Sequence, residues 1–359
     1  MTPDKKIFLS FDFYGAGNIG DDLMLKGFIN GMGSGNYEFY CFIPRNNSHQ
    51  VKRFEGINFI SAEEKENISA GCKIWIGAGD TPVQVKSGDW FINKLLNDSS
   101  QKKNNNFKYF FIGIGAEKEA ENRKETFSKI LNEVDHIWTR DEMTTEMLEK
   151  KMSIPSVKIS TSSDLANIFL KEAFENEEEN GQRKYDIGLC YYDESAEDNN
   201  VLSIKKFLKK NFKNKNVLMF SNDVSMKGNF EFAIYGKMFG KFERKFNRYI
   251  EFYAPDYLNE PDLKNLISHY PECSIVMSSR YHSLLTAAWA GCKVISLERS
   301  SKVTSLAKEL GIHEVKKPFT PEKLKESLSI AKRVDKNTLI EFYNISMNGI
   351  DDLKNRIKS

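Results

Sequence analysis

The sequence predicts an α/β protein of two domains, each with a parallel β-sheet between layers of helices. Three observations support this fold class. Short runs rich in Ile, Val, Phe and Tyr alternate with amphipathic stretches of helical spacing. The alternation forms two series with a charge-rich stretch between them. The chain has 359 residues, which suits two domains at roughly 100–200 residues each.

The apolar runs give the predicted strands in order. The first series covers 7–14, 37–43, 57–61, 73–78, 109–114, 136–140 and 157–161, and the second covers 185–192, 216–221, 249–254, 273–278 and 292–297. Helical patterns lie between them, among them 119–132, 142–151 and 200–213. Strands that alternate with helices form parallel sheets that are covered on both faces, so we expect two Rossmann-like domains.

The boundary between the two series is a run of charged residues. Residues 171–184 (KEAFENEEENGQRK) contain many charges and a glycine, which predicts a solvated linker. We expect an N-terminal Rossmann-like domain over 1–172, a linker over 173–184, a C-terminal Rossmann-like domain over 185–332 and a C-terminal helix within 333–359. The apolar spacing in that last segment predicts the helix over 335–358.

Composition excludes several classes of protein. Lys and Arg total 52 against 50 Asp and Glu, and this balance argues against a nucleic-acid-binding protein. No stretch reaches the ~18 apolar residues of a membrane span, and the N-terminus is typical of a first strand and not of a signal peptide. The five cysteines are scattered, with no C-x-x-C and no zinc spacing. We therefore expect reduced thiols and a cytoplasmic location.

A glycine-rich turn follows the first predicted strand. Gly15-Ala-Gly-Asn-Ile-Gly20 matches the G-x-G-x-x-G pattern of dinucleotide sites, and Glu38 lies near the second strand, where an acidic residue can hold a ribose. However, Asp21 and Asp22 follow the turn at once. Two carboxylates in the first turn of a helix repel a pyrophosphate, so they indicate helix stabilisation or hydroxyl binding, and we disfavour a dinucleotide.

Two further strands end in glycine. Gly77-Ala-Gly-Asp80 and Gly113-Ile-Gly115 allow a ligand to approach the backbone closely. Each also fits a turn that needs positive φ, and for either one alone we prefer the turn.

The strongest candidate site follows the apolar run 273–279. Arg280 and His282 lie between this run and the apolar segment 283–290, and a charge between two buried elements is costly unless it meets a partner. The Arg suits an anion and the His suits proton transfer near neutral pH, although His282 also fits a hydrogen-bonded core position. Lys302 and Arg140 follow other strands. Taken singly, Lys302 fits a surface lysine and Arg140 fits an ion pair with Asp141.

Together these segments resemble the polysaccharide pyruvyl transferase family. The matching pieces are FYGAGNIGDDLML (13–25), GIGAEKE (113–119), DHIWTRDEMTTEMLE (135–149), ISTSSDLA (159–166), YAPDYLNEPDLKNLI (253–267) and SSRYHSLLTAAWAGCKVISLERSSKVTSLAKELG (278–311). They span nearly the whole chain. Two departures are Gly77-Ala-Gly-Asp80, where the family often has three glycines, and Tyr281, where Leu is common.

The resemblance implies a two-lobed fold of the GT-B glycosyltransferase type with a cleft between the lobes. It implies transfer of a pyruvyl (carboxyethylidene) group from phosphoenolpyruvate to two hydroxyls of a sugar in a surface or exported polysaccharide, with release of phosphate. No metal and no cofactor are expected. Positions held important for the donor or for chemistry correspond to Arg140, Arg280, His282 and Lys302.

Phosphoenolpyruvate carries a phosphate and a carboxylate, so its site needs several fixed cations. We expect Arg140, Arg280, Lys302 and Ser279 to bind this donor, with His282 and Arg280 as catalytic residues. Hydroxyls of the acceptor are expected to bind the N-terminal lobe, at Asn18, Asp21, Asp22 and Asp80.

Two alternatives stay open. One is a GT-B nucleotide-sugar glycosyltransferase that uses Arg280 and Lys302 on a diphosphate leaving group. The other is a non-catalytic glycan- or nucleotide-binding protein. Acceptors in such pathways include lipid-linked glycans, which would allow peripheral association with a membrane through 237–249 (KMFGKFERKFNRY), although an ordinary amphipathic helix is the simpler interpretation of that segment.

Overall fold

The computed structural model describes residues 6–33, 35, 37–42, 53–85, 88–175, 183–193, 198–224, 230–239 and 250–359. The chain forms two compact units. The first unit contains 1–16, 21–169 and 341–359, and the second contains 17–20 and 170–340. The chain therefore passes between the units more than once, and each unit is described by itself.

The first unit is built on a seven-stranded sheet in the order β3-β2-β1-β4-β5-β6-β7, and every pairing in it is parallel. Its inner strands are buried on both faces, which requires helices on both sides. The strands are β1 (Lys6–Leu9), β2 (Glu38–Phe42), β3 (Ile57–Ile60), β4 (Ile74–Ala78), β5 (Lys108–Ile114), β6 (His136–Thr139) and β7 (Ile159–Thr161).

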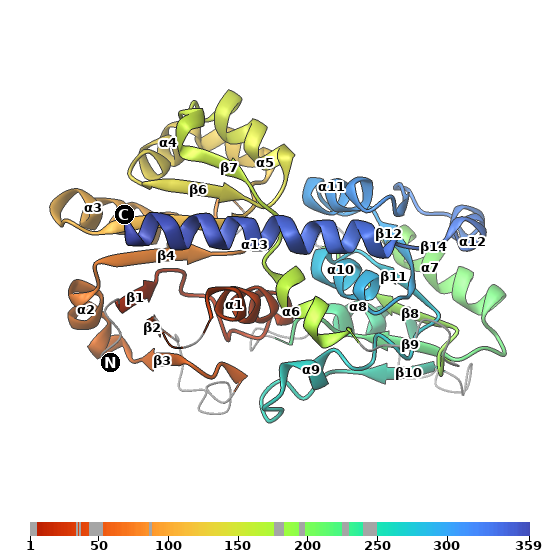
Figure 1. The fold of residues 1–359 in the computed structure, drawn as a ribbon. Helices are drawn as coiled ribbons and strands as arrows, with labels where there is room; N and C mark the ends of the chain where they lie inside the picture. The colour runs from red at the N-terminus through yellow and green to blue at the C-terminus, as the bar shows by residue number, and fades with distance from the viewer. Residues whose placement is uncertain are drawn as a thin grey trace. The chain divides into compact units, whose positions relative to one another are not determined.

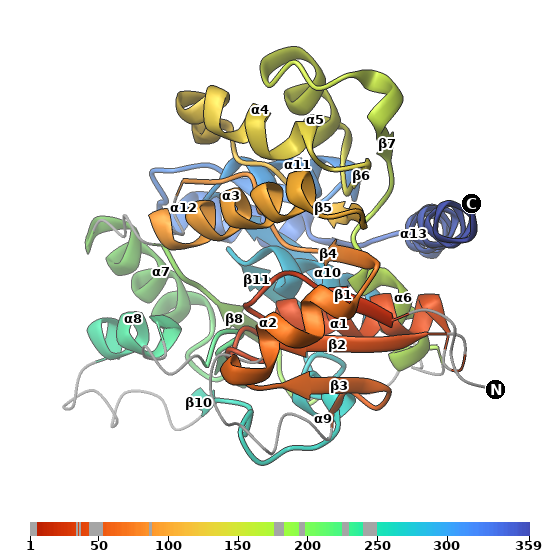
Figure 2. The ribbon, with the colours of Figure 1, turned by 90° about the vertical axis from the view of Figure 1, so that its left-hand side faces the viewer.

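Helices cover this sheet, with α3 on one face and α13 on the other (Figure 2). Small residues bring α1 close to its neighbours: Gly27 lies against the Leu165 carbonyl, and Gly31 lies against Ile168 and Ile350. Besides α13, the helices that lie wholly or partly in this unit are α1 (Ile19–Met32), α2 (Ala62–Gly71), α3 (Asp89–Asn104), α4 (Lys124–Asn132), α5 (Glu142–Glu146) and α6 (Ala166–Ala173), with short helical turns η2 (Lys118–Arg123), η3 (Met147–Lys151) and η4 (Ser156–Lys158).

The second unit has its own sheet in the order β10-β9-β8-β11-β12-β13, and a seventh short strand, β14, pairs with β12 in the antiparallel sense. The other pairings are parallel. The strands are β8 (Ile187–Cys190), β9 (Val217–Phe220), β10 (Ile250–Tyr253), β11 (Ile275–Ser278), β12 (Lys293–Leu297), β13 (His313–Val315) and β14 (Lys332–Arg333).

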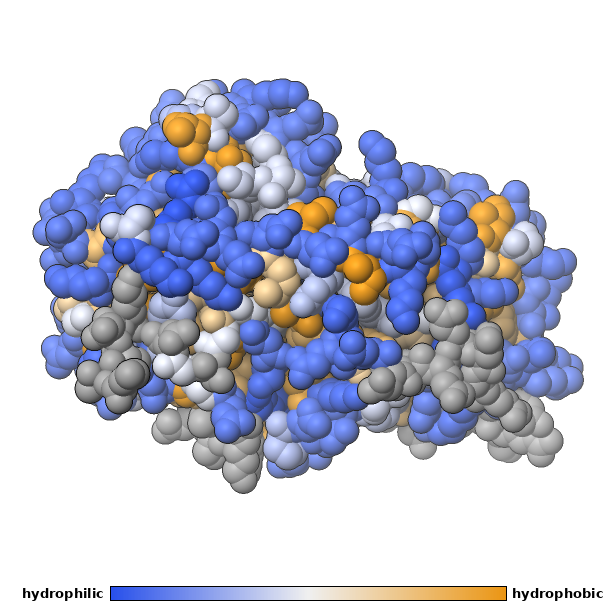
Figure 3. All heavy atoms as spheres, in the orientation of Figure 1, coloured by the Kyte–Doolittle hydropathy of each residue, from blue (hydrophilic) through white to orange (hydrophobic). Residues whose placement is uncertain are grey.

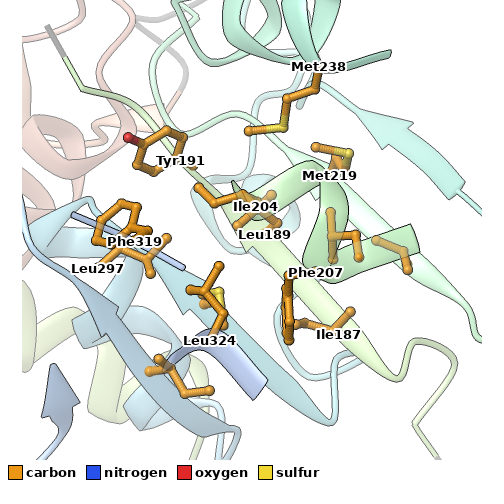
Figure 4. Packing of buried hydrophobic residues seen from close by; sticks show 14 of the residues in the cluster. Ile187, Leu189, Tyr191, Ile204, Phe207, Met219, Met238, Leu297, Phe319 and Leu324 are labelled. Atoms are coloured by element: carbon orange, nitrogen blue, oxygen red, sulfur yellow. The ribbon is translucent and has the colours of Figure 1, made fainter. Parts of the chain in front are cut away.

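The core of the second unit lies between its strands and the helices that cover them. Ile187 and Leu189 of β8 pack with Phe207 of α7 and Leu324 of α12 in one buried cluster (Figure 4). The helices are α7 (Asp198–Asn211), α8 (Phe230–Phe239), α9 (Leu263–Leu266), α10 (Tyr281–Trp289), α11 (Ser301–Glu309), α12 (Pro321–Ile330) and α13 (Lys336–Lys358), whose residues from Glu341 onward belong to the first unit (Figure 1).

The two-sheet α/β architecture predicted from the sequence is confirmed, with two corrections. The strand predicted over 7–14 ends at Leu9, and the remainder forms the loop that leads to α1. The strands β13 and β14 were not predicted, because each is too short to give an apolar run. The stretch predicted as a linker over 173–184 includes 176–182, which lies outside the described residues, and α6 extends to Ala173.

The face in Figure 3 is largely hydrophilic, with hydrophobic residues in small separate groups. None of the helices in the described parts of the chain combines the length and the hydrophobicity needed to cross a bilayer. Of the segment 237–249, predicted as the site of membrane contact, residues 240–249 lie outside the described residues. All five cysteines are buried free thiols.

Candidate functional site

The second sheet reverses its strand order between β8 and β11, which are neighbours although the strands β9 and β10 lie between them in the sequence. Open α/β sheets bind ligands at such a switch point, outside the carboxyl ends of the strands. Tyr192 follows β8 and Arg280 follows β11. The sequence-predicted junction at 278–283 therefore lies at the position where the topology favours a ligand.

Ser279 joins the two strand ends at this switch point. Its hydroxyl donates a hydrogen bond to the Tyr192 carbonyl at 2.7 Å and accepts one from the Tyr192 N–H at 2.9 Å. The Ser278 hydroxyl accepts the Arg280 N–H at 3.0 Å. The predicted donor-binding Ser279 thus has a defined task within the fold, which is to fix the backbone that carries Arg280.

Two carboxylates hold the Arg280 guanidinium. Its Nε donates to Glu231 Oε1 at 2.7 Å, and its Nη2 lies 3.5 Å from Asp223 Oδ2. Burial alone would lower the pKa of Arg280, but Glu231 and Asp223 outweigh burial and raise it. Burial raises the pKa of Glu231, and Arg280 offsets part of that rise. Arg280 is therefore charged and held in one orientation.

The Tyr192 ring lies against two guanidinium groups. The Cζ of Arg280 is 4.6 Å from the ring centroid, and the Cζ of Arg299 is 4.9 Å from it. Both distances are within the range of cation–π attraction. Arg299 follows β12, the strand next to β11. Sequence reasoning singled out neither Tyr192 nor Arg299, although Arg299 follows its strand as Arg280 follows the preceding one.

Lys302 lies three residues after Arg299, at the start of α11. It is the second residue of α11, and Ser300 is the residue that precedes this helix. Because β11 and β12 pair in parallel, with Ser278 opposite Ser296, their carboxyl ends lie at the same edge of the sheet. The structure thus brings Ser279, Arg280 and His282 to one strand end and Lys302 to the neighbouring one.

His282 is the second residue of α10, and its ring fills the space beside Gly20. A Cβ on Gly20 would lie 2.1 Å from His282 Nδ1, so no larger residue fits at position 20 with the ring in this place. The Tyr281 ring packs edge-on against the imidazole, with the centroids 5.1 Å apart. The last glycine of the predicted glycine-rich turn is therefore required by the imidazole, within the second unit.

Asn18 belongs to the same group of contacts. Its Oδ1 accepts the Gly20 N–H at 3.1 Å, which caps the start of α1. Its backbone forms a bridge with Asp223, the residue that pairs with Arg280. Asn18 was predicted to bind the acceptor beside Asp21, Asp22 and Asp80, but the structure places it with the second unit and those three residues with the first.

The first sheet has its own switch point, between β1 and β4. The Tyr14 hydroxyl, in the loop after β1, donates to the Ala78 carbonyl at the end of β4 at 2.5 Å. Asp80 follows with φ of 61°, a conformation that few residues other than glycine adopt. Among the residues that the structure describes, none makes a hydrogen bond to the partly exposed Asp80 carboxylate. Asp80 is the predicted acceptor residue with the most suitable placement.

Asp22 has a structural task instead. It accepts the Gly15 N–H at 3.0 Å and faces Arg53 at 3.5 Å, with both side chains fully buried. Asp22 is thus buried and already paired, and its predicted role in binding the acceptor stays a prediction. The Gly15 N–H is thus already bonded, which further disfavours a pyrophosphate on this loop. Asp21 lies in the first turn of α1 and is also buried.

Arg140 lies buried in the first unit. Its Nη2 donates to Thr81 Oγ1 at 3.1 Å, and its other nitrogens lie 3.5 Å from Asp141 and 3.7 Å from Asp164. A Cβ on Gly115 would lie 2.5 Å from Nη2, so this glycine accommodates the Arg140 guanidinium. The local ion pair with Asp141 is present. The expectation that Arg140 binds the donor with Arg280, His282 and Lys302 stays a prediction, because those residues belong to the other unit.

Two other histidines, His269 and His136, are buried away from solvent. Burial lowers the pKa of His269 to about 3 and that of His136 to about 4, so both imidazoles are neutral near pH 7. Within the described ranges, no group of His, Cys, Asp or Glu side chains has the arrangement of a metal site.

A family model matches most of the chain. The family model for polysaccharide pyruvyl transferases matches residues 18–301. The chain belongs to the polysaccharide pyruvyl transferase family. The match begins at Asn18 in the turn that contacts His282 and ends at Ser301, at the start of α11. Among curated proteins, none matches this sequence.

Solved structures show that this pyruvyl transferase family member has the GT-B-type fold. The chain is similar to a UDP-N-acetylglucosamine 2-epimerase from Rickettsia bellii, with a TM-score of 0.65 at 10% identity, covering 98% of this chain and 96% of that one. It is also similar to a sucrose-phosphate synthase from Thermosynechococcus elongatus, with a TM-score of 0.60 at 12% identity, covering 98% and 99%. Anabaena HepE in complex with UDP and glucose has a TM-score of 0.62 at 6% identity, covering 99% of each chain.

Proposed function

We propose that this protein transfers a pyruvyl group from phosphoenolpyruvate to two hydroxyls of a sugar in a polysaccharide. The observation that carries the proposal is the arrangement of Arg280, Arg299 and His282 at the switch point of the second sheet, in a chain of the polysaccharide pyruvyl transferase family. The GT-B-type fold alone would suit a nucleotide-sugar enzyme equally well.

The donor imposes a charge requirement. Phosphoenolpyruvate carries a phosphate and a carboxylate, and Arg280 alone would supply little net charge because Glu231 and Asp223 already face it. Arg299, which also contacts the Tyr192 ring, and Lys302, at the start of α11, add positive charge at the same sheet edge. We assign the donor to Arg280, Arg299 and Lys302, with Ser279 holding the backbone and Arg140 as the predicted contribution of the first unit.

The reaction needs one proton delivered to carbon. Protonation of the methylene carbon C3 makes C2 electrophilic, and a sugar hydroxyl oxygen attacks C2. The C2–O bond to phosphate then breaks, and the second hydroxyl closes the cyclic ketal. Of the two hydroxyl protons, one balances the new methyl group and the other leaves with phosphate. We assign His282 to these proton transfers, because an imidazole can donate or accept a proton and Gly20 leaves it room at the helix start.

The acceptor needs groups that bind neutral hydroxyls. Asp80 supports this role best, since its carboxylate is partly exposed at the switch point of the first sheet and its backbone is held in a left-handed conformation. Asp21, in the first turn of α1, is the second candidate.

The test measures phosphate release from phosphoenolpyruvate in the presence of the native glycan, with mass spectrometry of the product. Each modified sugar should gain one pyruvate minus one water. His282→Ala and Arg280→Ala should each lower turnover by about 100-fold. His313→Ala, a partly exposed histidine in β13, serves as the control and should leave turnover unchanged.

Stabilisation of the protein distinguishes the alternatives, because only a true donor should raise the melting temperature of the folded state. Phosphoenolpyruvate should do so, and nucleotide sugars should not. Stabilisation by a nucleotide sugar with no phosphate release from phosphoenolpyruvate would identify a glycosyltransferase, and stabilisation by a glycan alone would identify a binding protein.

A further inference from the structure

One of the four tryptophans is exposed. Trp90 is 54% exposed, whereas Trp75, Trp138 and Trp289 are at most 9% exposed. Trp90 is the second residue of α3, and α3 follows the loop that leaves β4. The ring is therefore near the carboxyl end of β4, as Asp80 is.

The helix does not need a tryptophan at this position. The buried face of α3 is formed by Phe91, Leu95 and the residues that share their spacing. One turn after Trp90 the Lys94 side chain is 10% exposed and pairs with Asp98, and two turns after Trp90 the helix carries the exposed Asn97. Trp90 thus offers an exposed aromatic ring that the buried face of the helix does not use.

The Trp90 ring packs against a neighbouring aromatic side chain. Trp90 and Phe91 have their centroids 5.2 Å apart, and Phe91 packs in turn against Phe11 and Phe13 at 5.6 and 5.9 Å. Phe13 is itself partly exposed and lies in the loop after β1. The aromatic group Phe13, Trp90 and Phe91 therefore borders the switch point of the first sheet, between β1 and β4.

Hydrogen-bonding groups lie at the same end of α3 as Trp90. Asp89, which precedes Trp90, pairs with Arg123 at the end of η2, with 2.5 Å between Oδ1 and Nη1. The Asp89 side chain is 68% exposed and the Arg123 side chain is 44% exposed. The pair supplies both acceptors and donors at the start of α3, where Trp90 also lies.

We propose that Trp90 is a stacking platform for a pyranose ring of the acceptor glycan, with Asp89 and Arg123 binding its hydroxyls. A pyranose has an apolar face of C–H groups and a rim of hydroxyls, which matches an aromatic ring bordered by a carboxylate and a guanidinium. A membrane surface is a poorer match, because an anionic bilayer would favour a basic rim and would be repelled by Asp89. The inference rests on the proposed function for the identity of the glycan as acceptor.

The first experiment uses tryptophan fluorescence and needs no turnover. Acrylamide should quench mainly Trp90, since the other three tryptophans are buried. Lactose, cellobiose and N,N′-diacetylchitobiose are the probes, together with the native glycan, and a bound sugar should lower the quenching constant at least about twofold. Trp90→Phe should abolish this change in fluorescence. Unchanged quenching with every probe would overturn the proposal, and so would protection by anionic phospholipid vesicles alone.

The second experiment separates the acceptor from the donor. Trp90→Ala should raise the KM for the glycan about fivefold to tenfold and leave the KM for phosphoenolpyruvate unchanged, and Trp90→Phe should recover most of the loss. Leu202→Ala, which removes another exposed apolar side chain (45%), is the matched control and should change neither value. Normal glycan KM in Trp90→Ala would refute the platform. Sugar protection of Trp90 without any phosphate release would instead refute the proposed function and keep the platform.

Discussion

The contact between Gly20 and His282 allows a sharp test of the catalytic role of the imidazole. Gly20→Ala adds one methyl group at the second position of α1. The new Cβ would lie 2.1 Å from Nδ1 and 2.6 Å from Cγ of His282. Ordinary van der Waals contact begins at 3.4 Å, so the imidazole has to move by more than 1 Å.

The expected effect on activity is much larger than the effect on stability. Overpacking of a well-packed site costs about 1–3 kcal/mol, and an alanine in a helix returns about 0.5–1 kcal/mol of that relative to glycine. Displacement of a catalytic group by about 1 Å costs on the order of 100-fold in rate. Gly20→Ala should therefore fold with a modest loss of stability and release phosphate about 100-fold more slowly.

The assay combines phosphate release with thermal unfolding, with and without phosphoenolpyruvate. Donor stabilisation should persist in Gly20→Ala, because the contacts of Arg280 with Glu231 and Asp223 do not involve this glycine. Gly236→Ala in α8 is the control, since a Cβ there meets no atom within 4 Å, and it should raise stability slightly with normal activity. Phosphate release at the wild-type rate by folded Gly20→Ala would refute the assignment of His282.

Three other measurements test the structure. The free energy of unfolding should fall by about 2 kcal/mol for each of His136 and His269 between pH 7 and pH 5. In the unfolded chain these imidazoles have a pKa of about 6.5 and bind protons in this range, whereas the buried ones, with a pKa of about 4 for His136 and about 3 for His269, do not. His269→Phe should halve this pH dependence in urea unfolding. Arg53→Met removes the cation that faces the buried Asp22 and should cost about 3 kcal/mol by the same assay, whereas loss of less than 1 kcal/mol would show that the pair matters little. Tyr192→Leu should raise the KM for phosphoenolpyruvate about fivefold to tenfold, with Tyr192→Phe near wild type, and equal effects of the two variants would exclude the cation–π contact.

Local patterns were sufficient for most of the fold, because a buried parallel strand is a short apolar run and the runs are separated by amphipathic stretches. The pattern was insufficient where pairing decides the outcome. The strand β14 has two exposed residues, Lys332 and Arg333, and exists because it pairs with β12. The end of β1 was misplaced because Phe11, Phe13 and Tyr14 are as apolar as the strand but pack in the loop that follows it.

For the candidate site, the sequence indicated which chemistry was present but not which groups partner each other. Arg140 and Asp22 were correctly seen as charges at strand and helix ends, but their partners Asp164 and Arg53 are distant in the chain. For one glycine, the sequence did not show which side chain occupies the space beside it. Gly115 offered room for a ligand in the sequence, and the structure fills that room with the Arg140 guanidinium.

The two switch points differ in charge, and this difference bears on which substrate each unit binds. The first carries the partly exposed Asp80 carboxylate, which would repel phosphoenolpyruvate but accept hydrogen bonds from sugar hydroxyls. The second carries Arg280 and Arg299 on one tyrosine ring, which would attract the anionic donor. Removal of either charge should therefore affect one substrate only. Asp80→Asn should weaken binding of the glycan alone, and Arg299→Gln should weaken binding of the donor alone. A variant of either residue that weakened both substrates equally would mean that charge does not divide the substrates in this way.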